Sequence, residues 1–167
     1  MELRVTSTDD EQLLLDLLNT TPVIDGVPTD DLADPADADA WMAAHGLPPD
    51  PADRDALIGV RNAVQAVVRD GASPELLRPF LSGVHLTPAL DDTGITWQVT
   101  GGDAAARVAL AWDGLRIASP GRLRPCANTE CHLFLLDRSK PNNARWCSMA
   151  VCGNRMKARR HYRRTRG

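Results

Sequence analysis

The sequence predicts an α+β protein with a mainly helical N-terminal domain that contains one β-hairpin, followed by a small cysteine-bearing module. Apolar residues recur at helical spacing over much of residues 1–120, and two strand-like runs flank a turn signal at residues 91–94. All four cysteines lie beyond a Ser-Pro-Gly linker at residues 119–121. We therefore divide the chain into domains of residues 1–120 and 121–167.

The first half of the chain contains two well-marked helices. Residues 9–18 form a leucine-rich helix, and residues 25–40, rich in Asp, Ala and Pro, are expected to form an exposed acidic loop before a helical turn at Trp41. Asp50 is a good N-cap for a helix that begins at Pro51. That helix ends at Gly71, and its buried face comprises Leu57, Val60, Val64, Val67 and Val68.

The rest of the body adds a short helix, a hairpin and a third long helix. A start signal at residues 73–75 precedes a helix that should bury Leu76, Leu77, Phe80 and Leu81. Residues 84–90 and 95–100 predict the hairpin. Residues 104–112 would also suit a strand, but their alanine content and Asp103 as an N-cap favour a helix.

Charge separates the two parts of the chain. Residues 1–120 carry 7 Lys+Arg against 20 Asp+Glu, a net charge of −13, whereas residues 121–167 carry 12 against 2, a net charge of +10. This asymmetry is typical of an acidic body with a basic end that binds nucleic acid or a membrane surface. No apolar run is long enough to span a bilayer, and the first residues lack a signal-peptide layout, so we expect a soluble cytoplasmic protein.

The cysteines occur as two close pairs, Cys126-x4-Cys131 and Cys147-x4-Cys152, separated by fifteen residues. Each pair can supply two ligands from one tight turn to a tetrahedral ion, and four thiolates leave no open coordination position. The alternatives are two disulfides or four unrelated thiols, and a reducing cytosol disfavours the disulfides. His132 could replace a ligand, although the cysteine set is already complete. We predict one structural zinc ion.

The residues between and after the cysteine pairs predict a treble-clef-like module. Residues 133–136 form a strand, residues 144–146 return as its partner, and a helix follows from Ser148. Phe134 and Trp146 would form a miniature core.

The C-terminal helix is dense in positive charge. Arg155, Arg159, Arg163 and Arg166 fall on one stripe at about 100° per residue, with Arg160 and Arg164 beside it and Tyr162 within it. Like charges at this density destabilise an isolated helix, and a polyanion removes that cost. We predict nucleic-acid contacts from these arginines, from Lys157 and from Arg145. The alternatives are a solvated tail or a tail folded back on the acidic body. A membrane is disfavoured because the helix lacks an apolar face.

The segment from Cys126 to Lys157, with Cys131-His132-Leu133-Phe134, Asp137-Arg138-Ser139 and Cys152-Gly153-Asn154-Arg155, resembles the CGNR zinc finger. The body resembles the ABATE domain at residues 14–20, Trp41 and Leu57-x3-Arg61. The resemblance implies a zinc-dependent DNA-binding module on a sensory domain, as in bacterial proteins described as stress-induced transcription regulators. Family hairpin tips are often richer in arginine than residues 140–144 here, which shifts the expected phosphate contacts to the helix.

The body itself offers no nucleophile motif, phosphate loop or metal cluster, so we expect no enzyme. Asn19, Thr20 and Arg61 form its one polar set worth singling out, because they border apolar helix faces. Arg61 could recognise a small anionic effector, or it could pair with an acid such as Asp16. The sequence thus predicts a DNA-binding transcription regulator, and the alternative is an RNA- or protein-interaction adaptor with a purely structural zinc. A homodimer would suit paired half-sites.

Overall fold

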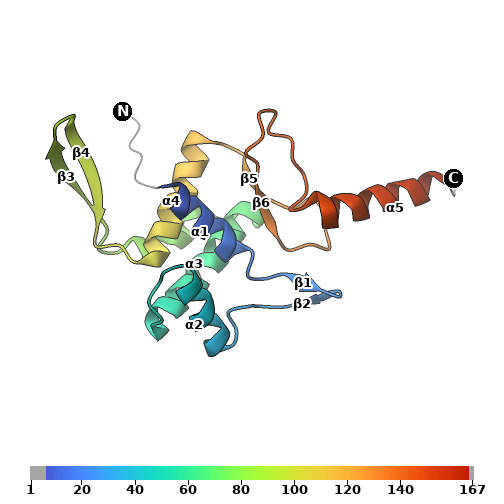
Figure 1. Ribbon diagram of the computed structural model, residues 1–167, viewed down its shortest axis with the longest axis horizontal. Coiled ribbons are helices and arrows are strands. Elements are labelled where there is room, and N and C mark those ends of the chain that lie inside the picture. The colour runs from blue at the N-terminus through green and yellow to red at the C-terminus, as the bar shows by residue number, and fades with distance from the viewer. Residues whose placement is uncertain (1–6, 166–167) are drawn as a thin grey trace.

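A computed structural model describes residues 7–165 (Figure 1). Three helices pack around the main hydrophobic core: α1 (Thr8–Leu18), α3 (Pro51–Asp70) and α4 (Ala104–Ala118). The fold class is α+β as predicted, since short antiparallel strand pairs accompany the helices. Fully buried side chains at the centre of this core include Leu14, Leu17, Leu18, Leu57, Val60, Val64 and Val108.

The predicted capping residues begin and end these helices. Asp50 accepts hydrogen bonds from the backbone N–H groups of Ala52 and Asp53, and Gly71 ends α3 with a left-handed φ of 67°. Asp103 likewise accepts from Ala106 N at 2.8 Å, so residues 104–112 are helical and the helix continues to Ala118. Local side-chain chemistry therefore sets where α3 and α4 begin.

The expectation of an exposed loop at residues 25–40 is wrong in part. A two-residue turn at Asp25 (φ 51°) and Gly26 (φ 81°) joins β1 (Val23–Ile24) to β2 (Val27–Pro28). An Asp-Gly pair tolerates positive φ at both central positions, which is what tight hairpin turns require. Further on, Asp34 caps helix α2 (Pro35–Ala44) with the same Asp-Pro start signal that opens α3.

Residues 74–81 form a 3-10 helix, η1 (Pro74–Leu81), which contains Pro79. A proline inside a helix removes a backbone donor and disfavours the α form. Of the four apolar residues predicted to be buried, only Leu77 is. A 3-10 helix has three residues per turn, so Leu77 and Phe80 share the inner face and Leu76 and Leu81 lie on exposed faces. Phe80 is half-buried against α3 at Gly59, where an added Cβ would lie 3.1 Å from the ring.

The predicted hairpin is present as β3 (His85–Asp91) and β4 (Gly94–Thr100), paired in register from His85 with Thr100 to Asp91 with Gly94. It projects from the body on the side away from the C-terminal helix α5 (Asn154–Thr165) (Figure 1).

The strand pairing predicted for the C-terminal module is wrong. β6 (Phe134–Leu136) pairs with β5 (Leu123–Pro125), which precedes the first cysteine, and residues 144–146 form no strand. The buried carboxylate of Asp137 closes the intervening loop instead: it accepts hydrogen bonds from Ser139 N, Ser139 Oγ and Ala144 N at 2.6–2.9 Å. Those bonds, from Ser139 Oγ first, together with Arg124 at 2.7 Å, lower the pKa of Asp137 to about 2.

The predicted miniature core of Phe134 and Trp146 is also wrong. Phe134 is 1% exposed and belongs to the main core, beside residues of α1 and α3. β6 packs on α1 and β5 packs on α3, so the strands of the zinc module extend the core of the body. Trp146 is half-buried and lies close to Gly153, the last residue of η2 (Met149–Gly153).

Candidate metal centre and nucleic-acid interface

The four cysteine sulfurs converge on one point. The Sγ atoms of Cys126, Cys131, Cys147 and Cys152 all lie within 4.8 Å of one another. Cys147 Sγ is 3.7 Å from both Cys131 Sγ and Cys152 Sγ, and tetrahedral zinc with Zn–S bonds of about 2.3 Å places its sulfurs ~3.8 Å apart. The spacing and the donor type both fit a structural zinc ion held by four thiolates, with no free coordination position.

Each ligand is placed by a different short element. Cys126 directly follows β5, and Cys131 closes a turn in which its backbone N–H donates to Asn128 O at 2.8 Å. Cys147 precedes η2, a single π-helical segment that contains Cys152. Ser148, from which the helix was predicted to start, precedes η2, and its side chain makes no capping hydrogen bond. The first cysteine pair therefore lies on a tight turn, the zinc knuckle (residues 126–131). The second pair lies at the start of the C-terminal helical segment, and the two pairs face each other.

Two N–H donors support the sulfurs. Cys147 N donates to Cys126 Sγ at 3.4 Å, and Asn128 Nδ2 donates to Cys152 Sγ at 3.5 Å. Asn128 is fully buried, and sequence reasoning missed it. Its only signal was a polar residue inside the first Cys-x4-Cys turn, where an amide can reach a sulfur. Such donors stabilise thiolate charge and orient the ligands.

The electrostatics of the cluster call for a cation. Burial raises the pKa of Cys131 to about 11 and also raises the pKa of Cys147, whereas at Cys152 burial is outweighed by hydrogen bonds, that from Asn128 first, which lower the pKa. Thiols packed this closely do not all ionise unless positive charge is supplied, because each thiolate disfavours the next. A divalent zinc ion supplies that charge, so its binding releases protons and stabilises the fold.

The basic helix α5 extends away from the body (Figure 1), and none of its residues is buried. It carries all the predicted nucleic-acid residues except Arg145, which precedes Cys147, and Arg166, which lies outside the described residues. Within residues 7–165, the one salt bridge made by α5 joins Arg159 Nη2 to Glu130 Oε2 at 2.6 Å. The other cations on α5 are Arg155, Lys157, Arg160, Arg163 and Arg164.

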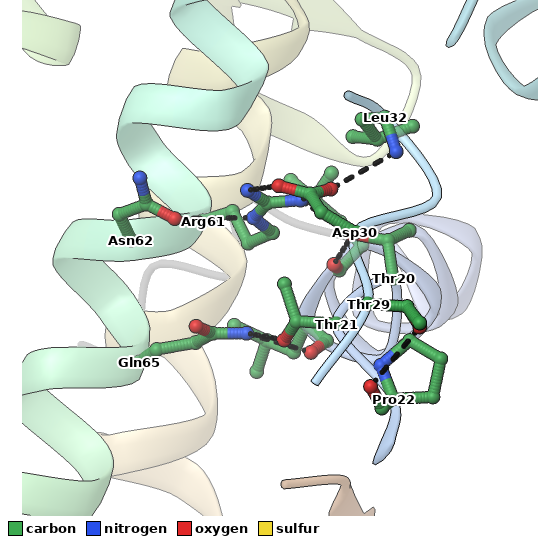
Figure 2. Close-up of polar contacts among 11 residues, drawn as sticks. Thr20, Thr21, Pro22, Thr29, Asp30, Leu32, Arg61, Asn62 and Gln65 are labelled. Carbon is green, nitrogen blue, oxygen red and sulfur yellow. Dashed lines mark hydrogen bonds and ion pairs between the residues drawn. The ribbon is translucent and has the colours of Figure 1, made fainter. Parts of the chain in front are cut away.

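The polar set predicted in the body is divided between two places, of which Figure 2 shows the one around Arg61, Asp30 and Thr20. Arg61 is 2% exposed, and its guanidinium donates to both carboxylate oxygens of Asp30 at 2.7 Å and to Thr20 Oγ1 at 2.9 Å. The acid that pairs with Arg61 is thus Asp30, and the suggestion of Asp16 is wrong. Asp16 pairs with His45 instead: Asp16 Oδ2 lies 3.3 Å from His45 Nε2, because α2 brings that ring close to α1.

Asn19 points elsewhere, to the backbone of Phe134 in β6. The structure therefore brings Thr20 and Arg61 together and places Asn19 at the junction with the zinc module. The side chains of all three make hydrogen bonds within the chain itself, and binding of a small anionic effector there stays a prediction.

None of the helices in the described part of the chain is both long and apolar enough to cross a membrane. Residues 122–165 match the family model of the CGNR zinc finger. Residues 11–127 match the ABATE family, whose description is "Putative stress-induced transcription regulator". The two matches overlap at residues 122–127, which include β5, the strand that packs on α3. No curated protein matches the chain. The chain therefore belongs to the ABATE family and carries a CGNR zinc finger at its C-terminal end.

Proposed function

We propose that this protein is a DNA-binding transcription regulator that acts in the cytoplasm, with residues 121–167 as its DNA-binding module. The observation that carries the proposal is an exposed, zinc-anchored helix in which half of the twelve residues are Lys or Arg. Six Lys or Arg residues lie between Arg155 and Arg164, and one of them is paired with an acid among the described residues. An exposed helix of this charge fits the phosphates of a duplex.

The attachment of α5 to the zinc site supports the same proposal. The π-helical segment before α5 holds a zinc ligand, and the strands before it extend the main core. A helix fixed in this way loses little conformational entropy when it docks, which is the advantage of a preformed binding surface. A solvated tail would need neither the ion nor the core contacts.

In this proposal residues 1–120 form a regulatory domain and catalyse no reaction. The ABATE family description supports a regulatory role. The proposal also includes a small anionic effector that binds near Thr20 and Arg61. It further includes a homodimer that binds two DNA half-sites, and each of these points has its own test. Equilibrium binding of small anions and sedimentation with and without DNA address them.

The experiment measures binding of the zinc-loaded protein to genomic DNA fragments, random duplex DNA and single-stranded RNA at 50 and 200 mM salt. Five phosphate contacts would lower affinity about 500-fold over that range, and a specific regulator retains a sequence-selected fraction. Changing Arg160, Arg163 and Arg164 together to Gln should abolish most binding. Arg78→Gln is the matched control, because Arg78 is an exposed arginine of the body. A clear preference for RNA, or no binding at all, would contradict the proposal.

A further inference from the structure

A cleft runs along one side of α5, between that helix and the residues that precede Cys147. Its volume is about 430 Å³, which is within the size range of sites that hold small ligands. The residues that shape it are Arg145, Trp146, Met156, Lys157, Arg160 and Arg163. Cationic side chains thus border a floor that contains an indole ring and a methionine.

The two walls of the cleft come from separate segments. Lys157, Arg160 and Arg163 are spaced three residues apart on α5, so they share one face of the helix. Arg145 stands opposite, and its guanidinium carbon lies 5.3 Å from the centre of the Trp146 ring. The carbonyl of Arg145 also accepts a hydrogen bond from Ala127 N at 2.8 Å, which ties this wall to the zinc knuckle.

The floor depends on a close approach of Trp146 to the start of α5. Gly153 is buried, and a Cβ added there would lie 3.3 Å from Trp146 Cδ1. Trp146 and Met156 are both half-buried, so each keeps part of its apolar surface toward the cleft. An apolar floor between cationic walls is suited to a ligand that alternates anionic and apolar groups.

Another side of α5 has different surroundings. Arg159, at the border of the cleft, is held by Glu130 at 2.6 Å. Arg155 lines a second cavity that also contains Asp25 and Glu130. Acidic residues of the body and of the turn between Cys126 and Cys131 therefore partly offset the charge on this side, whereas Arg145, Lys157, Arg160 and Arg163 of the cleft make no ion pair among residues 7–165.

We propose that the cleft seats the sugar–phosphate backbone of one nucleic-acid strand, with the phosphate between Arg145 and Arg160 and the sugar against Trp146 and Met156. This inference rests on the proposed function and assigns one part of the surface to it. Backbone contacts fix the position of a protein on DNA without reading sequence. The cleft then sets affinity for all sequences alike, and any base contacts come from other parts of the helix.

Single substitutions distinguish binding in the cleft from a general effect of positive charge on α5. Arg145→Gln and Arg160→Gln each remove one exposed cation from a wall of the cleft, whereas Arg155→Gln removes the same charge from the partly offset side of α5. Zinc content and circular dichroism equal to those of the unmodified protein verify folding. We expect each cleft variant to lose about tenfold in affinity for every duplex sequence at 50 mM salt. The slope of log affinity against log salt concentration should become shallower by ~0.9. Arg155→Gln should lose less than about threefold, since Arg155 lies outside the cleft and lines a cavity with Asp25 and Glu130.

Tryptophan fluorescence tests whether the nucleic acid contacts Trp146 on the floor of the cleft. The difference in emission between the unmodified protein and Trp146→Phe isolates Trp146 from the other three tryptophans. Duplex should change this signal, and millimolar inorganic phosphate alone should not. Equal losses for Arg145→Gln and Arg155→Gln, or an unchanged Trp146 signal on binding, would overturn the proposal while leaving DNA binding in place. A Trp146 response to inorganic phosphate but not to duplex would assign the cleft to free phosphate and also overturn it. Failure of the unmodified protein to bind any polynucleotide overturns the proposed function itself, and this inference with it.

Discussion

The side chain of Asn19 forms a two-way hydrogen-bonded clasp with the backbone of Phe134. Asn19 Oδ1 accepts from Phe134 N at 2.7 Å, and Asn19 Nδ2 donates to Phe134 O at 3.3 Å. One partner is the C-cap residue of α1, and the other is a strand residue of the zinc module, 115 positions away. The clasp fixes the finger against the body at the point where Phe134 enters the main core.

We expect Asn19→Ala to destabilise the whole chain. The substitution leaves a backbone N–H without a partner beside a fully buried side chain, which costs about 1–3 kcal/mol. Denaturant unfolding measures the loss. Gln12→Ala is the control, because Gln12 donates only to Asp16 on the exposed side of the same helix. Equal unfolding midpoints for the two variants would show that the clasp contributes nothing.

The sequence signals that held are local ones. Asp50, Pro51 and Gly71 mark the ends of α3 with no help from the rest of the chain. The spacing of the cysteine pairs, together with the expected reducing compartment, likewise predicted the metal site. Asn19 was singled out as a candidate for ligand binding, and its partner in the structure is a backbone segment that no local pattern names.

The failed predictions depend on long-range packing. Leu123-Arg124-Pro125 has too little alternation to signal a strand, so its pairing with β6 could not be inferred. The loop closed by Asp137 replaces the expected return strand, and that requires a buried carboxylate with several donors around it. Which domain buries Phe134 is decided only when the finger packs on α1 and α3.

The ion pair of Arg61 with Asp30 gives a pH-dependent prediction. The hydrogen bond from Arg61 is the main cause that lowers the pKa of Asp30 below its usual value. A depressed folded-state pKa contributes stability that is present above the unfolded pKa of about 3.9 and lost as pH falls through the folded value. Asp30→Asn should therefore destabilise the protein by about 1–3 kcal/mol near pH 7, discounted from the full cost of a buried pair because Asp30 is partly exposed.

Unfolding of the unmodified protein and of Asp30→Asn, measured across pH, provides the check. The difference in unfolding free energy should be constant between about pH 5 and 7 and shrink below about pH 4. Loss of zinc in acid affects both proteins alike and cancels in the difference. A gap that stays constant into acid would refute the assigned role of the Asp30 carboxylate.

Gly101 makes a sharp prediction about the β3–β4 hairpin. Its φ is 75°, and an added Cβ would lie 2.2 Å from Gly83 O, a backbone atom that cannot rotate away. Gly71 has a similar φ of 67° and nothing within 4 Å of such a Cβ. Gly71→Ala should thus cost the ~1–2 kcal/mol of a left-handed alanine, and Gly101→Ala should cost more. Thermal unfolding of the two variants separates backbone conformation from steric clash, and equal losses would argue against the close approach.

Removal of zinc should weaken the body as well as the finger. The ligands hold the loops around β6, and β6 delivers Phe134 to the main core, where loss of a buried phenylalanine costs on the order of 3–5 kcal/mol. The difference in emission between the unmodified protein and Trp112→Phe isolates Trp112, a buried residue of α4, and follows the body. A strong zinc chelator should release one ion per chain, expose four reactive thiols and lower the unfolding midpoint reported by Trp112. The variant Cys126→Ser should show the lowered midpoint without chelator and respond little to its addition. If the Trp112 transition were unchanged when the ion leaves, the finger would be an appendage, and the core contact of Phe134 would not depend on the metal.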